Sequence, residues 1–158
     1  MCHFITLHGH VFSCGYGGDG QLGFGGLLTR PYPKRVMSFV DQGAVVVFAA
    51  AGDGHSLFLT NRGRVYVVGA GEEGQLGHGG PRDEDHLFGA KLEPYLLPPI
   101  SSFDGSPAKI EFAAAGFAHS MLVDSSGCVY TFGDGMRGRL GHGNEHSYQV
   151  RSCFFPCT

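Results

Sequence analysis

A glycine-rich motif that occurs three times is the feature that most constrains the fold of this chain. The copies read VFSCGYGGDGQLGFGG at 11–26, VYVVGAGEEGQLGHGG at 65–80 and VYTFGDGMRGRLGHGN at 129–144. Five glycines keep the same spacing in each copy, and the copies start 54 and then 64 residues apart. A motif repeated at such a period is typical of an array of similar structural units.

The second copy also contains the spacing Gly-x-Gly-x-x-Gly, at Gly69, Gly71 and Gly74, after a run of strand-forming residues. That order is typical of a dinucleotide-binding turn, in which the glycine loop opens a helix whose first amides hold the phosphates. Two more glycines, Gly77 and Gly79, follow within five residues here, and glycine is a poor helix former. We therefore expect compact turns at these positions and no bound cofactor.

A second repeated block indicates the shape of one unit. FAAAGDGHSLFLTNRGRV at 48–65 matches FAAAGFAHSMLVDSSGCV at 112–129. Each block holds two apolar runs, a short polar turn with glycine, and the strand that leads into the glycine motif, which indicates three strands. A fourth strand is expected within 31–39 in the first unit and near 92–97 in the second. The sequence predicts an all-β fold of four-stranded antiparallel units, the pattern of β-propeller blades.

The repeats divide the chain into units of approximately 1–47, 48–111 and 112–158, so that residues 1–158 form one incomplete propeller. The middle unit contains a further segment, 81–107, whose acidic start and proline- and serine-rich end predict an exposed loop insertion. A propeller normally closes on itself, which leaves few sheet edges and faces open. The chain is therefore expected to be part of a larger protein, or to need further blades or self-association to close.

Composition argues against several classes of function. The net charge is −3 and the isoelectric point is near 6.3, which argues against binding to nucleic acid or chromatin. No apolar run is long enough for a membrane span, and the first residues lack the pattern of a signal peptide. Five cysteines without a C-x-x-C pair argue against a disulfide framework or a zinc module. We expect an intracellular protein, cytoplasmic or nuclear, that works in a reducing compartment and has no membrane partner.

Histidines recur with the repeat, at His55 and His119 and again at His78 and His142. Histidine binds metals, but no cluster of cysteines and histidines surrounds these positions, so we expect hydrogen-bonding roles inside the blades and no metal site. No serine–histidine–aspartate set and no pair of carboxylates can be placed in one pocket from the sequence. We therefore expect no catalytic residues and no enzyme activity.

The motifs resemble the repeats of the regulator of chromosome condensation (RCC1) family. The resemblance rests on GEEGQLGHGG and AAGDGHSLFLTNRGRVYVVG, with three copies of the glycine motif and two of the histidine motif over nearly the whole chain. The tryptophan that usually precedes the first glycine is replaced by Cys14, Val68 and Phe132. The resemblance implies a seven-bladed propeller, of which this chain supplies about three blades.

Two functions follow from the resemblance. Many members are protein–protein interaction modules, and this role is the expected one, with a protein partner bound through the loops between strands. The alternative is guanine-nucleotide exchange on a Ran-type small GTPase, which needs no catalytic side chain because it works by favouring the nucleotide-free GTPase. Side chains that vary between copies at shared motif positions are the candidate partner contacts: Asp19, Glu72, Glu73, Met136 and Arg137.

Overall fold

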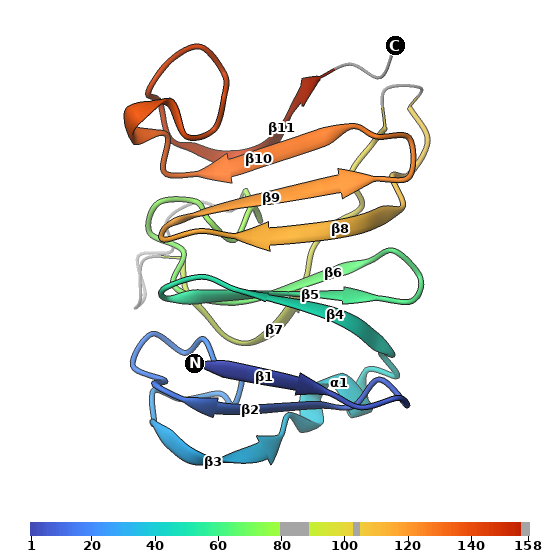
Figure 1. Ribbon diagram of the computed structural model, residues 1–158, viewed down its shortest axis with the longest axis vertical. Coiled ribbons are helices and arrows are strands. Elements are labelled where there is room, and N and C mark those ends of the chain that lie inside the picture. Colours follow the sequence, from blue (N-terminus) through green and yellow to red (C-terminus); the bar gives the residue numbers. More distant parts are fainter. Residues whose placement is uncertain (80–88, 103–104, 156–158) are drawn as a thin grey trace.

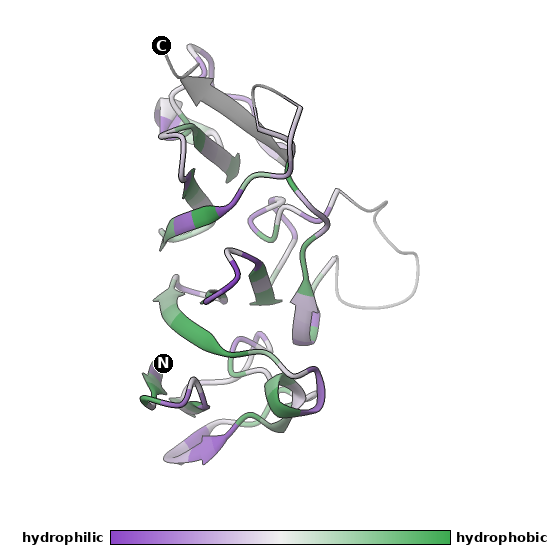
Figure 2. Ribbon diagram, turned by 90° about the vertical axis from the view of Figure 1, so that its right-hand side faces the viewer, coloured by the Kyte–Doolittle hydropathy of each residue, from purple (hydrophilic) through white to green (hydrophobic). Residues whose placement is uncertain are grey.

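Three antiparallel sheets are stacked face to face in the computed structural model, which describes residues 1–79, 89–102 and 105–155 (Figure 1). Figure 2 shows the same stack turned by 90°, with the chain running from the lowest sheet to the highest. The first sheet contains β1 (Cys2–Ile5), β2 (Val11–Gly15) and β3 (Arg30–Arg35). The second contains β4 (Val46–Ala51), β5 (His55–Thr60), β6 (Val65–Gly69) and β7 (Lys91–Leu96). The third contains β8 (Ile110–Ala115), β9 (His119–Asp124), β10 (Val129–Gly133) and β11 (Tyr148–Phe155). The predicted all-β fold of blades is confirmed.

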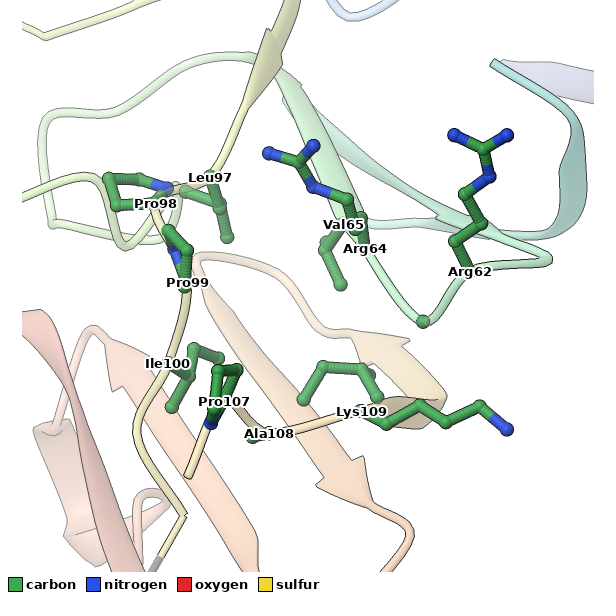
Figure 3. Close-up of a pocket in the computed structure, with 12 residues that line it drawn as sticks. Arg62, Arg64, Val65, Leu97, Pro98, Pro99, Ile100, Pro107, Ala108 and Lys109 are labelled. Atoms are coloured by element: carbon green, nitrogen blue, oxygen red, sulfur yellow. The ribbon is translucent and has the colours of Figure 1, made fainter. Parts of the chain in front are cut away.

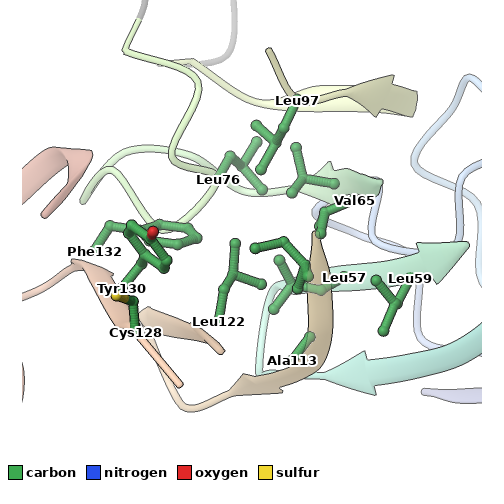
Figure 4. Close-up of a cluster of buried hydrophobic side chains, with 12 residues drawn as sticks. Leu57, Leu59, Val65, Leu76, Leu97, Ala113, Leu122, Cys128, Tyr130 and Phe132 are labelled. Carbon is green, nitrogen blue, oxygen red and sulfur yellow. The ribbon is translucent and has the colours of Figure 1, made fainter. Parts of the chain in front are cut away.

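Strand β6 explains why the central strands are apolar at nearly every position. Val65 and Val67 belong to the core between the second and third sheets, whereas Tyr66 and Val68 belong to the core between the first and second sheets. Successive residues of a strand point to opposite faces, so a sheet covered on both faces needs apolar residues at each position. Figure 4 shows the larger of the two cores, in which side chains from both sheets interdigitate.

The predicted hairpin between the second and third strands of a unit is confirmed. In the middle sheet, the turn from Thr60 to Arg64 joins β5 and β6, with Gly63 at φ 71°. The amide of Gly63 donates to the Thr60 carbonyl oxygen at 3.0 Å, and the Thr60 amide donates to the Arg64 carbonyl oxygen at 2.9 Å. Glycine adopts this left-handed conformation without the steric cost that a Cβ atom brings.

The two predicted fourth strands differ in outcome. The strand near 92–97 is confirmed as β7, so the segment 81–107 that was expected to be a loop insertion contains a strand; residues 80–88 and 103–104 lie outside the described residues. The strand predicted within 31–39 is wrong at its end, because β3 stops at Arg35 and the helix α1 (Met37–Asp41) follows.

The helix α1 has a packing role that the strand pattern did not indicate. Its Phe39 is buried, with its ring centroid 4.9 Å from that of Phe58 and 5.4 Å from that of Tyr66. A helical turn therefore brings an aromatic ring into the core between the first and second sheets. Edge-to-face contacts of this kind are favourable arrangements for aromatic pairs.

The innermost strands of neighbouring sheets approach closely. A Cβ atom on Gly52, which follows β4, would lie 2.5 Å from the carbonyl oxygen of Gly116, which follows β8. The small residues of Ala49–Gly52 and Ala113–Gly116 were expected at such a crowded place, and this contact agrees with that expectation.

The cysteines depart from the expectation of reduced thiols. Cys2 and Cys14 are free, whereas Cys128 is disulfide-bonded. Cys128 is fully buried. The cysteine spacing contained no sign of this bond, because its partner is set by the tertiary structure.

Candidate functional site

The three glycine loops, which follow β2, β6 and β10, lie at the same end of the stacked sheets (Figure 1). We call this end the glycine-loop face. In the middle loop, the Gly74 amide donates to the Gly71 carbonyl oxygen at 3.0 Å and the Gly77 amide donates to the Gly74 carbonyl oxygen at 2.9 Å. The other two loops repeat both hydrogen bonds at their corresponding glycines. The amides of Gly74 and Gly77 thus form hydrogen bonds inside the loop.

A buried glutamine anchors each of the first two loops to the next sheet. Gln21 and Gln75 are 1% and 4% exposed. The Cα atom of Gln21 lies 3.1 Å from where a Cβ atom on Gly69 would be, and Gln75 has the same relation to Gly133. Gly69 has a φ of 106° and its Cβ would also lie 2.3 Å from the Gly54 carbonyl oxygen. Only glycine allows this close approach.

The glutamine side chains also hold the positions of two candidate contacts. The Gln21 Oε1 atom accepts from the Asp19 amide at 3.0 Å, and the Gln75 Oε1 atom accepts from the Glu73 amide at 2.9 Å. The backbone at these loop positions is therefore fixed by a buried group, while the side chains extend from it.

A serine of the next sheet donates a hydrogen bond to the backbone carbonyl of each of these glutamines. Ser120 Oγ donates to the Gln75 carbonyl oxygen at 2.7 Å and lies 2.9 Å from His55 Nε2. Because the single hydroxyl hydrogen of Ser120 goes to the carbonyl, His55 Nε2 carries a hydrogen and is the donor in the second bond. The recurrent histidine thus has the structural role that the sequence predicted, and it links the second sheet to the third.

The first pair of sheets uses a different histidine for the same link. Ser56 Oγ donates to the Gln21 carbonyl oxygen at 3.0 Å, and His3 Nε2 lies 2.8 Å from Ser56 Oγ. Sequence alignment of the repeats places His3 opposite Leu57, so its role was missed. The repeat signal could not reveal it, because His3 reaches the same serine from another position of the strand.

Burial keeps both linking histidines neutral. The pKa of His55 is lowered to about 4, mainly by loss of hydration and also by the proximity of His119, against the opposing effect of a hydrogen bond involving the His119 backbone. Burial, together with the positive amino terminus, lowers the pKa of His3 to about 4. Neither imidazole is protonated at neutral pH.

The structure brings the five predicted contact residues to the glycine-loop face in two different environments. Glu72, Glu73, Met136 and Arg137 are exposed, with Arg137 held in a left-handed conformation at φ 59° in the short helix η1 (Met136–Gly138). Asp19 is half-buried instead, and its Oδ2 atom accepts from the side-chain Nε2 atom of Gln21 at 3.1 Å. Four of the five side chains are therefore accessible, and Asp19 also contributes to the loop anchor.

The third loop contains a salt bridge beside these exposed residues. Arg139 Nη1 lies 3.0 Å from Asp134 Oδ2, with both side chains largely buried, and Arg139 Nε donates to the Met136 carbonyl oxygen at 2.9 Å. The two arginines of this loop thus differ, since Arg139 holds the loop and Arg137 extends outward. The face is acidic at Glu72 and basic at Arg137, so a partner that spans it meets both signs of charge.

Two observations concern other kinds of site. Within the described residues, no group of three or more histidine, cysteine, aspartate or glutamate side chains is arranged to hold a metal ion. In the same part of the chain, no helix is both long and apolar enough to cross a membrane.

Comparison with models of protein families shows to which family this chain belongs. A sequence model described as the regulator of chromosome condensation (RCC1) repeat matches residues 8–59, 62–123 and 126–158, and a second model of the same repeat matches 46–75. The chain belongs to the RCC1 repeat family. The three matches begin within the β-hairpin turns, not at the unit boundaries deduced from the sequence, which stay a prediction.

The chain is similar to proteins of very different lengths, of which it covers only a part. The chain is 35% identical to Protein RCC2 homolog of Xenopus laevis over 94% of its own length and 26% of the relative. It is 34% identical to the human E3 ubiquitin-protein ligase HERC2 over 89% of its length and 3% of that protein. It is 32% identical to the Ultraviolet-B receptor UVR8 of Arabidopsis thaliana over 94% of its length and 31% of the receptor.

Solved structures of RCC1 proteins share the fold. Yeast RCC1 (Prp20), solved bound to Kap60, superimposes with a TM-score of 0.78 at 26% identity, over 98% of this chain and 35% of that one. Human WBSCR16 superimposes with a TM-score of 0.77 at 25% identity, over 96% and 34%. The chain thus spans at most about a third of these relatives, and its three sheets correspond to blades of a partial RCC1-type propeller.

Proposed function

We propose that this chain is a protein–protein interaction module that binds a protein partner through its glycine-loop face. The observation that carries the proposal is the contrast within each loop. Buried groups that recur between repeats fix the backbone, as Gln21 and Gln75 do, while the neighbouring exposed side chains differ from loop to loop. Rigid scaffolds that present variable loop residues are a common architecture for binding sites.

Family membership supports the same function. Relatives as different as an RCC2 homolog, a ubiquitin ligase and a light receptor carry these repeats. The repeats are thus not tied to one activity, which agrees with a role in binding. The chain in this proposal acts by association and not as an enzyme, inside the cell in the cytoplasm or nucleus. No membrane and no nucleic acid is among the proposed partners.

A capture experiment with matched variants tests the proposal. The immobilised chain and its Glu72→Ala/Glu73→Ala variant are incubated with native cell extract, and retained proteins are identified by mass spectrometry. The control is Asp41→Ala, which removes an exposed carboxylate of α1 away from the glycine loops. We expect a partner that the control retains and the loop variant loses. Retention of the same partners by all three chains would contradict a role for these glutamates.

Guanine-nucleotide exchange on a Ran-type small GTPase is the second candidate. It is favoured by the likeness to Prp20p from Saccharomyces cerevisiae, whose structure is reported with its binding properties to Gsp1p and histones. The TM-score is 0.77 over 98% of this chain but 36% of Prp20p. Exchange requires a surface that binds the nucleotide-free GTPase better than the loaded form.

Release of a fluorescent GDP analogue separates the two candidates. A Ran-type GTPase loaded with the analogue is mixed with excess unlabelled GDP, with and without the chain. Accelerated release that is lost in the Glu72→Ala/Glu73→Ala variant would establish exchange through the glycine-loop face. An unchanged release rate in the presence of a captured partner leaves the interaction module as the function.

A further inference from the structure

A groove lies between the second and third sheets, and Figure 3 shows the residues that line it. It includes the β5–β6 turn, which lies at the end of the sheets opposite to the glycine loops (Figure 1). Its volume is about 240 Å³. Three segments build it: the β5–β6 turn at 62–65, the stretch 97–100 that leaves β7, and the stretch 107–110 that enters β8. We call it the hairpin groove.

The floor of the hairpin groove is apolar and continuous with the core. Val65, Leu97 and Ile110 line it, and all three belong to the hydrophobic core between the second and third sheets. Proline residues of the two connecting stretches form its wall, and proline restricts the backbone to a narrow range of conformations. The groove therefore offers a firm apolar slot of a size that suits one or two aliphatic side chains and is smaller than the usual pocket for a small-molecule ligand.

Three cationic residues are part of the lining of this slot. Arg62, Arg64 and Lys109 line the groove, and its lining contains no aspartate or glutamate. Lys109 Nζ lies 3.9 Å from Glu111 Oε1, but both side chains are more than half exposed, and such pairs bind weakly. Neither arginine belongs to an ion pair among the residues that the structure describes. Three cations thus cluster in a chain whose net charge is −3.

The fold does not require these cations. The equivalent turn between β1 and β2 carries His8 and His10 at the positions of Arg62 and Arg64. Val45 lies at the junction of the first and second sheets where Lys109 lies at the junction of the second and third. The Val45 carbonyl oxygen accepts from the Asn61 amide at 3.0 Å, and the Lys109 carbonyl oxygen accepts from the Ser125 amide at 2.8 Å. The same turn forms without arginine or lysine at these positions, so the three cations have no evident structural role.

The groove is formed before any partner binds. The Ile110 amide donates to the Gly63 carbonyl oxygen at 3.0 Å, which fixes the turn against the strand of the next sheet. The Ala108 amide donates to the Ile100 carbonyl oxygen at 2.7 Å, which joins the two connecting stretches to each other. A preformed site loses less conformational freedom on binding than a mobile one.

We propose that the hairpin groove binds an acidic peptide segment of a partner protein, with an aliphatic side chain of the peptide in the slot and its carboxylates on Arg62, Arg64 and Lys109. Guanidinium groups form paired hydrogen bonds with carboxylates. Single-stranded nucleic acid is the less favoured ligand, because its recognition relies on aromatic side chains on which bases stack, and the groove lining has none.

Fluorescence anisotropy with a labelled peptide of sequence DEDLLDED tests the proposal on the full chain. The variant Arg62→His/Arg64→His places in this turn the residues that the β1–β2 turn already contains. At about pH 7.5, where most histidine is neutral, we expect it to weaken peptide binding by roughly tenfold or more. Lys34→Glu reverses an exposed charge on β3 of the first sheet and serves as the control; we expect less than a roughly twofold change from it.

Peptide variants test both parts of the recognition without any risk to folding. The peptide DEDSSDED lacks the aliphatic side chains and KRKLLKRK reverses the charge, and we expect each to bind more weakly than DEDLLDED. The proposal is overturned if the arginine variant binds the peptide as well as the wild type does, if the charge-reversed peptide binds equally, or if DEDLLDED does not bind. Tighter binding of an oligouridylate than of the peptide, lost in the same arginine variant, would assign the groove to nucleic acid and also overturn it. Because this groove lies away from the glycine loops, its test is independent of the capture experiment.

Discussion

Acidification should destabilise this protein through His55, a residue that links two sheets without being exposed to solvent. Its side chain is fully buried and its Nε2 atom donates to Ser120. The pKa of His55 is about 4 in the folded protein against an ordinary value of 6.5. Between these two values the unfolded chain binds a proton that the folded protein does not, so stability falls as the pH falls from about 6.5 to about 4.

The size of the effect follows from the two pKa values of His55. At neutral pH both states are mostly deprotonated, so the His55 contribution is small. At about pH 4.5 the unfolded state is almost fully protonated at this site while the folded state is mostly neutral, and the difference in free energy of unfolding is about 2 kcal/mol. A loss of this size is a substantial fraction of the total stability of a typical domain.

Urea unfolding at a series of pH values measures this effect, with His55→Gln as the comparison. The glutamine amide keeps a donor for Ser120 and does not titrate. We expect the wild type to lose about 2 kcal/mol more than the variant between neutral pH and about pH 4.5. Protonation of His3 contributes to both chains and cancels in this difference. Equal losses in the two chains would refute the reasoning.

Three further predictions concern positions where the structure leaves little freedom, and thermal or urea unfolding measures each of them. Ser120→Ala leaves the buried His55 Nε2 donor and the Gln75 carbonyl oxygen of the second unit without their partner in the third sheet, and should cost about 2–4 kcal/mol; a loss below about 1 kcal/mol would show that the link between sheets is dispensable. Gly69→Ala introduces a Cβ atom 2.3 Å from the Gly54 carbonyl oxygen at a φ of 106° and should destabilise the protein by more than about 2 kcal/mol. Gly143 has a φ of 75° and no atom within 4 Å of the added Cβ, so Gly143→Ala should cost only about 1 kcal/mol. Equal costs would contradict the steric argument. Burial of Asp124 raises its pKa, but hydrogen bonds from Ser126, Tyr130 and two backbone amides outweigh this effect and lower the pKa overall. Asp124→Asn should therefore destabilise the protein most at neutral pH and least in acid. The stabilisation by the carboxylate disappears as the pH falls through its folded-state pKa.

Prediction from sequence worked where the physical cause is local. The glycines after β6 were expected to build turns, and their positive φ angles and short-range hydrogen bonds are determined by neighbouring residues along the chain. The apolar run Val65–Val68 was expected to lie in a sheet covered on both faces, which the two cores confirm. The failure at Met37–Asp41 has a nonlocal cause, because the helix brings Phe39 against rings of the next sheet.

The candidate site was predicted only in part, because some of its contacts are local in the sequence and others are not. Variation between repeats identified Glu72 and Glu73 as loop residues that the fold does not constrain, and both are exposed. It could not show that Asp19, at an equivalent position, is held by Gln21 and half-buried. The repeats are similar in sequence, but each loop packs on a different neighbour.

The sequence by itself determined the repeat, the strands within each unit and the glycine turns, because backbone preferences and short apolar runs act over a few residues. Only the tertiary structure decided how the units are joined and what lies between them. His3 and His55 reach serines of the next sheet, and the hairpin groove combines residues from 62–65, 97–100 and 107–110. Such contacts depend on how one sheet faces the next, a relation between surfaces that no single repeat contains.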